Sequence, residues 1–508
     1  MYWLSGRTRN DLFMLYCFDD SRCSGAELRE LVARRSADIA DLSVQLRALP
    51  RDLDYPAWVR CEFRAEQFVE HSLPEPNWLG VCMVLGKLLG TGVDAAVRPW
   101  RLHVFRGVEG APAGTGPAMV VVLQMSHALA DGRRGAELAR ALFSEVGGTE
   151  SVAAGESPAG RLPVARAERS EAAAEAVTIA DAATAADGVA GVGATSVAGL
   201  RQSVARRVAG VAGQTARLGA AVVEAVPVYS VLALLRIPTQ FARTAVRGYQ
   251  AFRAQQELVE LTTAGRLPGP GPGFTPSLVN RSDSTARHAH QVRMIVCDAE
   301  RMRIPGHTVT VVALAAVSVA LDRYLTARGA RVDRLGAQVP MALSGNRIAA
   351  RNNYRSLGVE LFIDEPNLLV RANKIAAALN DRRTRARHPL LTAQDRVTAV
   401  IPAPLLRRDI GRYPIDTVPD SIAGHTVVSS VHRGPADLTF GGAPVRFTGG
   451  FPAIGSVMQL THGVHGLGDT VTVSIHADTA AVPDIDTYAN LLRDALNEVF
   501  ACAVGELG

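Results

Sequence analysis

Apolar and polar positions divide the chain into two structured regions and a middle stretch of different character. Residues 120–123 form a run of β-favouring apolar side chains, which is typical of a strand buried on both faces. In residues 133–144 the apolar positions recur at helical spacing, which predicts a helix soon after that strand. From about residue 290 to the C-terminus, strand-like and helix-like patterns alternate again. We therefore expect an α/β protein.

Two segments rich in loop-forming residues mark the ends of the middle stretch. Gly147-Gly148 and the small residues after it form one, and the alternating Pro-Gly run at 268–273 forms the other. Such a run continues neither a helix nor a strand. We expect an N-terminal lobe at 1–150, a helical connector at 151–290 and a C-terminal lobe at 291–508, which suits a chain of 508 residues.

The connector carries an unusual concentration of positive charge. Between Arg201 and Arg253 there are eight arginines and one acid, Glu224, whereas the whole chain has a net charge of +5. Apolar residues are interleaved at helical spacing, with expected breaks near Pro227 and Pro238. One interpretation is a pair of helices that pack on the lobes, and another is a segment that lies on anionic lipid. Its candidate membrane contacts are Arg206, Arg207, Arg236 and Arg243.

Composition excludes several classes of protein. With 48% hydrophobic and 20% charged residues, the chain is neither disordered nor a polytopic membrane protein. A charge of +5 is too mild to indicate a nucleic-acid partner. The six cysteines form no CxxC pair and no zinc signature, so we expect no metal site. The N-terminus lacks the features of a signal peptide, and we expect a cytoplasmic protein.

The strongest chemical signal follows the buried strand of residues 120–123. His127 comes where the chain leaves this strand, and Asp131-Gly132 comes where it turns toward the helix. A histidine held by a rigid strand and open to a cleft is well placed to act as a general base. The carboxylate of Asp131 can fix the turn or anchor a distant arginine, and Gly132 leaves room for the backbone.

This HxxxDG motif resembles the chloramphenicol acetyltransferase-like superfamily of CoA-dependent acyltransferases, and its surroundings are similar to the bacterial wax ester synthase/diacylglycerol acyltransferase family. Segments in both lobes carry the resemblance, in order along the chain. They are His71–Pro76, Asp94 with Arg98–His103, Gly306–Val317, Val339–Met341, Asn352-Asn353, Val428–Val431 with Gly434-Pro435, and Val471–Ile475 with Asp478, Pro483 and Asp484. The resemblance implies two lobes, each a mixed sheet with flanking helices, joined by a long helical connector.

The resemblance also implies a reaction. An acyl group would pass from acyl-CoA, a co-substrate with no other cofactor needed, to a lipid hydroxyl such as that of diacylglycerol or a long-chain alcohol. His127 would take the hydroxyl proton at the interface of the lobes, and Asp131 would hold its loop by pairing with an arginine from elsewhere. Such substrates imply a membrane surface or lipid droplet as partner, with the protein peripherally bound to the inner face of the membrane.

Three positions depart from the family pattern. Ser126 stands where the first of two histidines is usual, Thr310-Val311 replaces an Asn-Asp pair, and Ser430 replaces an asparagine. Hydroxyl groups at these positions can still donate one hydrogen bond. We take Ser126, Thr310, Asn353 and Ser430 as candidate substrate-binding residues. Two alternatives stay open, a carrier-protein-dependent acyltransferase acting on a polyketide or glycolipid, and a lipid-binding relative without catalysis.

Overall fold

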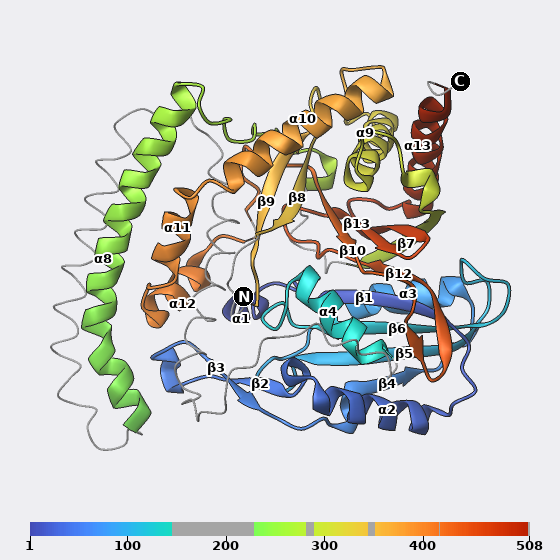
Figure 1. The fold of residues 1–508 in the computed structure, drawn as a ribbon, viewed down its shortest axis with the longest axis horizontal. Helices are drawn as coiled ribbons and strands as arrows, with labels where there is room; N and C mark the ends of the chain where they lie inside the picture. The colour runs from blue at the N-terminus through green and yellow to red at the C-terminus, as the bar shows by residue number, and fades with distance from the viewer. Residues whose placement is uncertain (145–227, 281–288, 344–350, 416, 506–508) are drawn as a thin grey trace, which may run out of the picture.

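Two six-stranded mixed sheets with helices on their faces make up the body of the protein (Figure 1). The computed structural model describes residues 1–144, 228–280, 289–343, 351–415 and 417–505. The α-helices of this part are α1 (Tyr2–Ser5), α2 (Gly25–Asp38), α3 (Trp78–Leu89), α4 (Gly132–Phe143), α8 (Val228–Thr263), α9 (Val309–Ala327), α10 (Leu368–Ala386), α11 (Leu391–Thr398), α12 (Ala403–Arg412) and α13 (Ile485–Gly505). The predicted α/β architecture with two sheet-containing lobes is confirmed.

The first sheet has the strand order β11-β12-β1-β6-β5-β4, and only its β4–β5 pair is parallel. Its central strand β6 is buried along its whole length, as the apolar run predicts. Helices α2 and α4 cover one face, and α3 covers the other. The strands are β1 (Leu12–Asp19), β4 (Phe68–His71), β5 (Trp100–Val108), β6 (Ala118–Met125), β11 (Thr439–Phe440) and β12 (Ala443–Gly450). A separate small sheet pairs β2 (Val44–Arg47) with β3 (Ala57–Arg60).

Strands β11 and β12 come from the C-terminal half of the chain but lie in the first sheet. β12 pairs with β1 along its length, from Met14 opposite Gly450 to Phe18 opposite Val445. The chain then returns to the second sheet, and β12 packs beside β13 and β14 there. Apolar side chains of α3 also pack against Val292 and Met294 of β7 in the second sheet. The two lobes are therefore joined by an exchanged strand and by a shared core, which fixes them relative to each other.

The second sheet has the order β7-β14-β13-β10-β8-β9 and buries the apolar helix α9. Its strands are β7 (His290–Asp298), β8 (Gly336–Ala342), β9 (Tyr354–Glu360), β10 (Thr426–His432), β13 (Leu460–Leu467) and β14 (Thr470–Asp478). Among the described residues, α9 is the one helix long and apolar enough to cross a membrane, and 78% of that stretch is buried inside the protein. Its composition therefore fits a core helix, packed between α10 and α13.

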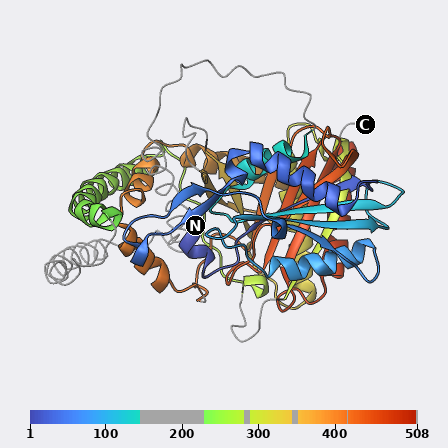
Figure 2. The same ribbon diagram turned by 90° about the horizontal axis from the view of Figure 1, so that it is seen from below.

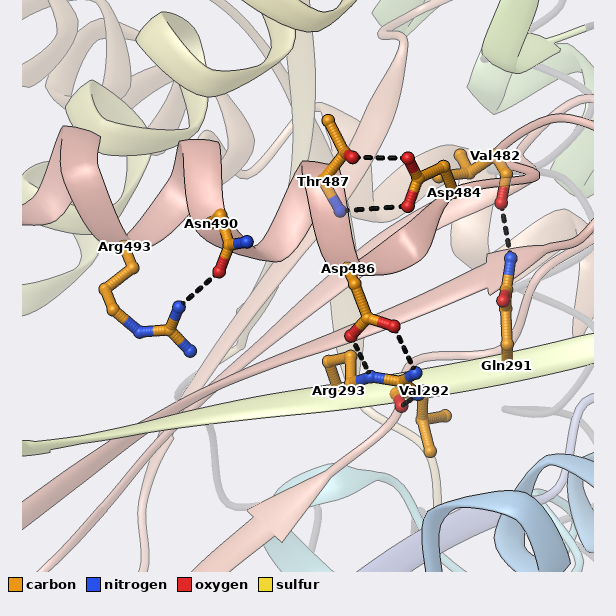
Figure 3. Close-up of polar contacts among 9 residues, drawn as sticks. All are labelled: Gln291, Val292, Arg293, Val482, Asp484, Asp486, Thr487, Asn490 and Arg493. Atoms are coloured by element: carbon orange, nitrogen blue, oxygen red, sulfur yellow. Dashed lines mark hydrogen bonds and ion pairs between the residues drawn. The ribbon is translucent and has the colours of Figure 1, made fainter. Parts of the chain in front are cut away.

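The start of α13 is clamped onto β7 by polar contacts (Figure 3). Arg293 of β7 donates two hydrogen bonds to the carboxylate of Asp486, at 2.6 and 2.7 Å. Asp484, just before the helix, accepts from the backbone N–H of Thr487 at 3.1 Å, which satisfies a free donor of the first turn. This pairing holds the C-terminal helix against the sheet whose strands line the candidate site.

Most of the described part of the connector is α8, a continuous helix of 36 residues. The sequence predicts a break near Pro238, and this prediction is wrong. Pro238 is exposed, so its ring meets solvent and the carbonyl that loses its partner can bind water. The helix lies at one end of the molecule (Figures 1 and 2) and packs against α11. There Thr244 Oγ1 donates to the carbonyl of Val400 at 2.8 Å.

Candidate active site

The candidate base, His127, lies in a loop between strand β6, which is buried along its whole length, and helix α4, whose N-terminus is capped by Asp131. Strand β6 ends at Met125, and α4 begins at Gly132, so residues 126–131 form the loop that the sequence predicts. Asp131 is the residue before α4, and its carboxylate accepts from the backbone N–H of Arg134 at 2.9 Å. A carboxylate at this position satisfies a free N–H group and suits the helix dipole. Both ends of the loop are thus fixed.

His127 is partly exposed and is bound by an asparagine from the other half of the chain. The ring atom Nδ1 lies 2.7 Å from Oδ1 of Asn352, and Nδ2 of Asn352 donates to the carbonyl of His127 at 2.7 Å. The carbonyl needs a donor, so the NH₂ group of Asn352 must face it and Oδ1 must face the ring. In the neutral imidazole Nδ1 therefore carries the proton, and Nε2 keeps its lone pair.

Burial also favours the neutral form of this imidazole. Loss of solvent lowers the pKa of His127 below its usual value, and the Asn352 hydrogen bond and the nearby charge of Asp131 only partly oppose this shift. The ring of Tyr354 at the start of β9 lies 5.9 Å from the imidazole, centroid to centroid. At neutral pH the side chain is thus an unprotonated base with one fixed tautomer, at the junction of the two lobes.

Asp131 joins the two lobes through backbone groups. Its second carboxylate oxygen accepts from the N–H of Asn353 at 3.1 Å, and its own N–H donates to the carbonyl of Arg351 at 3.0 Å. The resemblance implies an arginine partner for Asp131, but within the described residues no arginine side chain is ion-paired with it, and its carboxylate accepts from backbone N–H groups. Arg351 and Arg134 instead both bind Asp41, Arg351 at 3.0 Å. The carboxylate is therefore a structural anchor, and it works through N–H donors.

Gly132, the first residue of α4, lies near strand β10 of the second sheet. A Cβ built on this glycine would lie 3.7 Å from Cγ2 of Val431 on β10. Val431 follows Ser430, so this contact brings the candidate residue Ser430 into the region of the loop. Glycine is not demanded by its backbone conformation here, because an added Cβ would make only an ordinary contact. Its role in giving room at the site stays a prediction.

The four candidate substrate-binding residues differ in their surroundings. Ser126 is almost fully buried, and its Oγ accepts from the N–H of Ala128 at 3.3 Å. Nδ2 of Asn353 donates a hydrogen bond to the carbonyl of Leu343 at 2.9 Å. Thr310, in the first turn of α9, and Ser430, on β10, are partly exposed, and neither hydroxyl is hydrogen-bonded within the described residues. No described contact joins these four side chains to His127, so their roles stay predictions.

Sequence reasoning missed the residue that orients the base. Asn352 was noted only as part of a family segment, and its neighbour Asn353 was chosen as the candidate. The side chain of Asn352 binds His127, whereas that of Asn353 donates to the carbonyl of Leu343. The pattern shows two adjacent amides but does not tell which of them faces the histidine, because the contact spans 225 positions of sequence.

The predicted membrane contacts do not lie at this site. Arg236 and Arg243 are on α8, where Arg236 is partly exposed and Arg243 is exposed. Arg206 and Arg207 lie outside the described residues. In the part of the chain that the structure describes, no group of three or more His, Cys, Asp or Glu side chains is arranged to hold a metal ion.

Comparisons with known proteins agree with this arrangement. The family model of the wax ester synthase/diacylglycerol acyltransferase catalytic domain matches residues 13–256, and the model of the WS/DGAT C-terminal domain matches residues 336–499. No match was found among curated proteins.

The fold is shared, at low identity, with a solved structure of this kind. The wax ester synthase/diacylglycerol acyltransferase from Marinobacter aquaeolei VT8 has a TM-score of 0.53 at 15% identity, over 98% of this chain and 96% of that one. The starter condensation domain of rhizomide synthetase RzmA in complex with C8-CoA has a TM-score of 0.48 at 13% identity, over 99% and 92%. Because both domain models of one acyltransferase family match, in order and across both lobes, the chain belongs to the wax ester synthase/diacylglycerol acyltransferase family.

Proposed function

We propose that the protein is an acyl-CoA-dependent O-acyltransferase that esterifies a lipid hydroxyl. The acceptor would be diacylglycerol or a long-chain alcohol, and the product triacylglycerol or a wax ester. One observation carries the proposal: Oδ1 of Asn352 lies 2.7 Å from Nδ1 of His127 and accepts its proton, which leaves Nε2 as the basic nitrogen between the lobes. Family membership supplies the class of reaction, and this geometry supplies the group that can perform it.

The proposed chemistry needs one proton to move twice. Nε2 of His127 takes the proton of the acceptor hydroxyl as its oxygen attacks the thioester carbonyl. The tetrahedral intermediate then collapses, the carbon–sulfur bond breaks, and the imidazolium returns the proton to the CoA thiolate. The negative oxygen of the intermediate needs hydrogen-bond donors. The hydroxyls of Thr310 and Ser430, which are not hydrogen-bonded to any described residue, are our candidates, because the amide of Asn353 donates to Leu343. The scheme uses acyl-CoA as co-substrate and needs no resident cofactor, metal or nucleic acid.

Purified protein incubated with labelled acyl-CoA and a mixture of lipid alcohols tests this function. We expect labelled ester and free CoA in equal amounts, with no carrier protein added. Turnover that appears only when the acyl group is carried by a carrier protein would favour the polyketide or glycolipid alternative. Binding of acyl chains without any ester would favour the non-catalytic alternative, which the replacements at Ser126, Thr310 and Ser430 motivate.

We also propose that the protein is cytoplasmic and binds the inner membrane face or a lipid droplet through its connector. The outward side of α8 combines cations with large apolar side chains: Arg243 is exposed, and so are Val246 at 57% and Tyr249 at 63%. An interfacial helix shows this combination, because arginine heads bind lipid phosphates while apolar side chains enter the headgroup region. The other side of α8 is occupied by α11.

Vesicle binding tests the membrane proposal. In the double variant Arg236→Gln/Arg243→Gln we expect binding to phosphatidylglycerol vesicles at low salt to weaken by roughly 30-fold, since each arginine contributes about 1 kcal/mol near an anionic surface. Arg29→Gln/Arg331→Gln removes the same charge from exposed positions on other elements and should bind like the wild type. Equal binding by both double variants, measured by co-sedimentation, would contradict the role of α8.

A further inference from the structure

A cleft of about 760 Å³ opens beside the loop that carries His127. Its walls are the N-terminal segment, residues 48–52, residues 92–95 and the end of α12, and Ser126 lines it as well. Ser126 directly precedes the proposed base. A volume in this range is typical of a site for a small molecule or cofactor. The cleft therefore reaches the residue next to the proposed base, and the proposed mechanism does not yet use it.

The side chains that line this cleft are strongly polar. Three arginines, Arg7, Arg9 and Arg407, face two carboxylates, Asp52 and Asp94. Such a lining is unsuited to the hydrocarbon chain of a lipid acceptor, because it would leave charged groups desolvated and unpaired. It suits a ligand that is itself charged, and the excess of cations indicates an anion.

The two carboxylates already have partners. Asp52 is ion-paired with Arg407 and accepts from Nε1 of Trp3 at 3.3 Å. Asp94 accepts from the backbone N–H of Ala96 at 2.8 Å, which stabilises its own turn. Three guanidinium groups against two carboxylates leave part of the positive charge of the lining uncompensated.

The remaining two cations have no carboxylate bound to them in the described structure. Arg7 donates to the backbone carbonyls of Ile410 and Tyr413, the latter at 2.8 Å, so its charge faces the end of α12. Arg9 is exposed and makes no hydrogen bond or ion pair within the described residues. Burial raises the pKa of nearby Asp11 to about 6, and the charge of Arg9 opposes this rise only in part. A Cβ built on Gly92 would lie 2.7 Å from Nη1 of Arg9, which places this guanidinium on the cleft wall.

Aromatic side chains complete the lining. Tyr2 and Trp3 of α1 both border the cleft, and Trp3 is fixed by the ring of Tyr55 at 5.6 Å between centroids. A flat heteroaromatic ring can stack on such surfaces, and guanidinium groups beside them can bind phosphates bidentately. The combination matches a ligand with both a purine ring and phosphates.

We propose that this cleft binds the phosphate-bearing nucleotide end of the acyl-CoA donor, with Arg9 and Arg7 at its phosphates. The thioester would then pass Ser126 to reach His127. This inference rests on the proposed function, since it names where the donor of that reaction enters. The acceptor would have to approach His127 from another direction, because the cleft has no lining suited to its chains.

Calorimetric titration with CoA tests the proposal without any need for turnover. We expect Arg9→Gln to weaken CoA binding by roughly 10- to 100-fold, the effect of losing one hydrogen bond to a charged group. Pantetheine, which lacks the nucleotide, should bind wild type and variant equally. Arg22→Gln, at an exposed arginine of the same lobe outside the cleft, should bind CoA like the wild type. Arg9 makes no described hydrogen bond, so the variant is expected to fold.

Two further arms separate the possible sources of phosphate. Inorganic phosphate and a short-chain phosphatidate are titrated into the same three proteins. CoA affinity equal in wild type and Arg9→Gln overturns the proposal, as does phosphatidate binding that depends on Arg9 when CoA binding does not. Ester formation with unchanged CoA affinity in Arg9→Gln would leave the function intact and reject the cleft. CoA binding that depends on Arg9 without any ester formation would support the cleft and reject the function.

Discussion

Replacing His127 by alanine is expected to slow ester formation by about 10²- to 10⁴-fold, the range attributed to a positioned general base. The expectation follows from the single tautomer that Asn352 imposes: Nδ1 carries the proton and Nε2 is free to accept one. Burial lowers the pKa of His127, so the wild-type base is unprotonated at neutral pH and available for every turnover. Alanine removes this acceptor and leaves the hydroxyl of the acceptor lipid to attack unaided.

The measurement is the initial rate of labelled ester formation at saturating acyl-CoA, with thermal unfolding and CoA affinity determined on the same samples. His127→Gln is the matched variant, because it has a similar size and an amide that can still face Asn352 but no basic nitrogen. We expect both variants to bind CoA like the wild type and both to lose activity. An alanine variant that makes ester at the wild-type rate would falsify the proposed mechanism.

The elements around the base were predictable because each is specified by neighbouring residues. The apolar run of β6, the turn at Asp131-Gly132 and the periodicity of α4 lie within 30 positions, and the structure contains all three. Partners from distant segments were not predictable. Asp131 suggested an arginine partner by its charge, yet its carboxylate is satisfied by the backbone of Arg134 and Asn353. Almost every residue has a backbone N–H group, so the sequence cannot tell which of them will bind a given carboxylate, and only the fold shows it.

The same limit applies to the larger architecture. The alternating patterns after residue 290 do not say which sheet each strand joins, and β12 pairs with β1 across more than 400 positions. In the connector, the expectation that a proline interrupts the helix is wrong. Proline usually ends a helix, but exposed Pro238 sits within α8, which packs against α11.

Replacing Asn352 by leucine is expected to lower kcat by on the order of 10²-fold, since the ring of His127 would lose the group that sets its tautomer and direction. Leucine has the same number and branching of side-chain heavy atoms as asparagine but can neither accept from Nδ1 nor donate to the His127 carbonyl. In the proposed mechanism Asn352 contacts the base but not the substrate, so it is a positioning residue. CoA affinity should therefore stay close to that of the wild type.

The pH profile distinguishes positioning of the base from a general loss of structure. Activity requires the neutral imidazole, and the Asn352 hydrogen bond raises the pKa of His127 against the lowering effect of burial. Removing that bond lowers the pKa further, so the acid limb of kcat/KM should move to lower pH while kcat falls. Asn373→Leu, at an exposed asparagine whose Oδ1 lies 3.1 Å from His307 Nε2, is the control and should change neither quantity. A fall in kcat with an unmoved acid limb would show that Asn352 only supports the fold, because loss of folded enzyme scales the profile without shifting it.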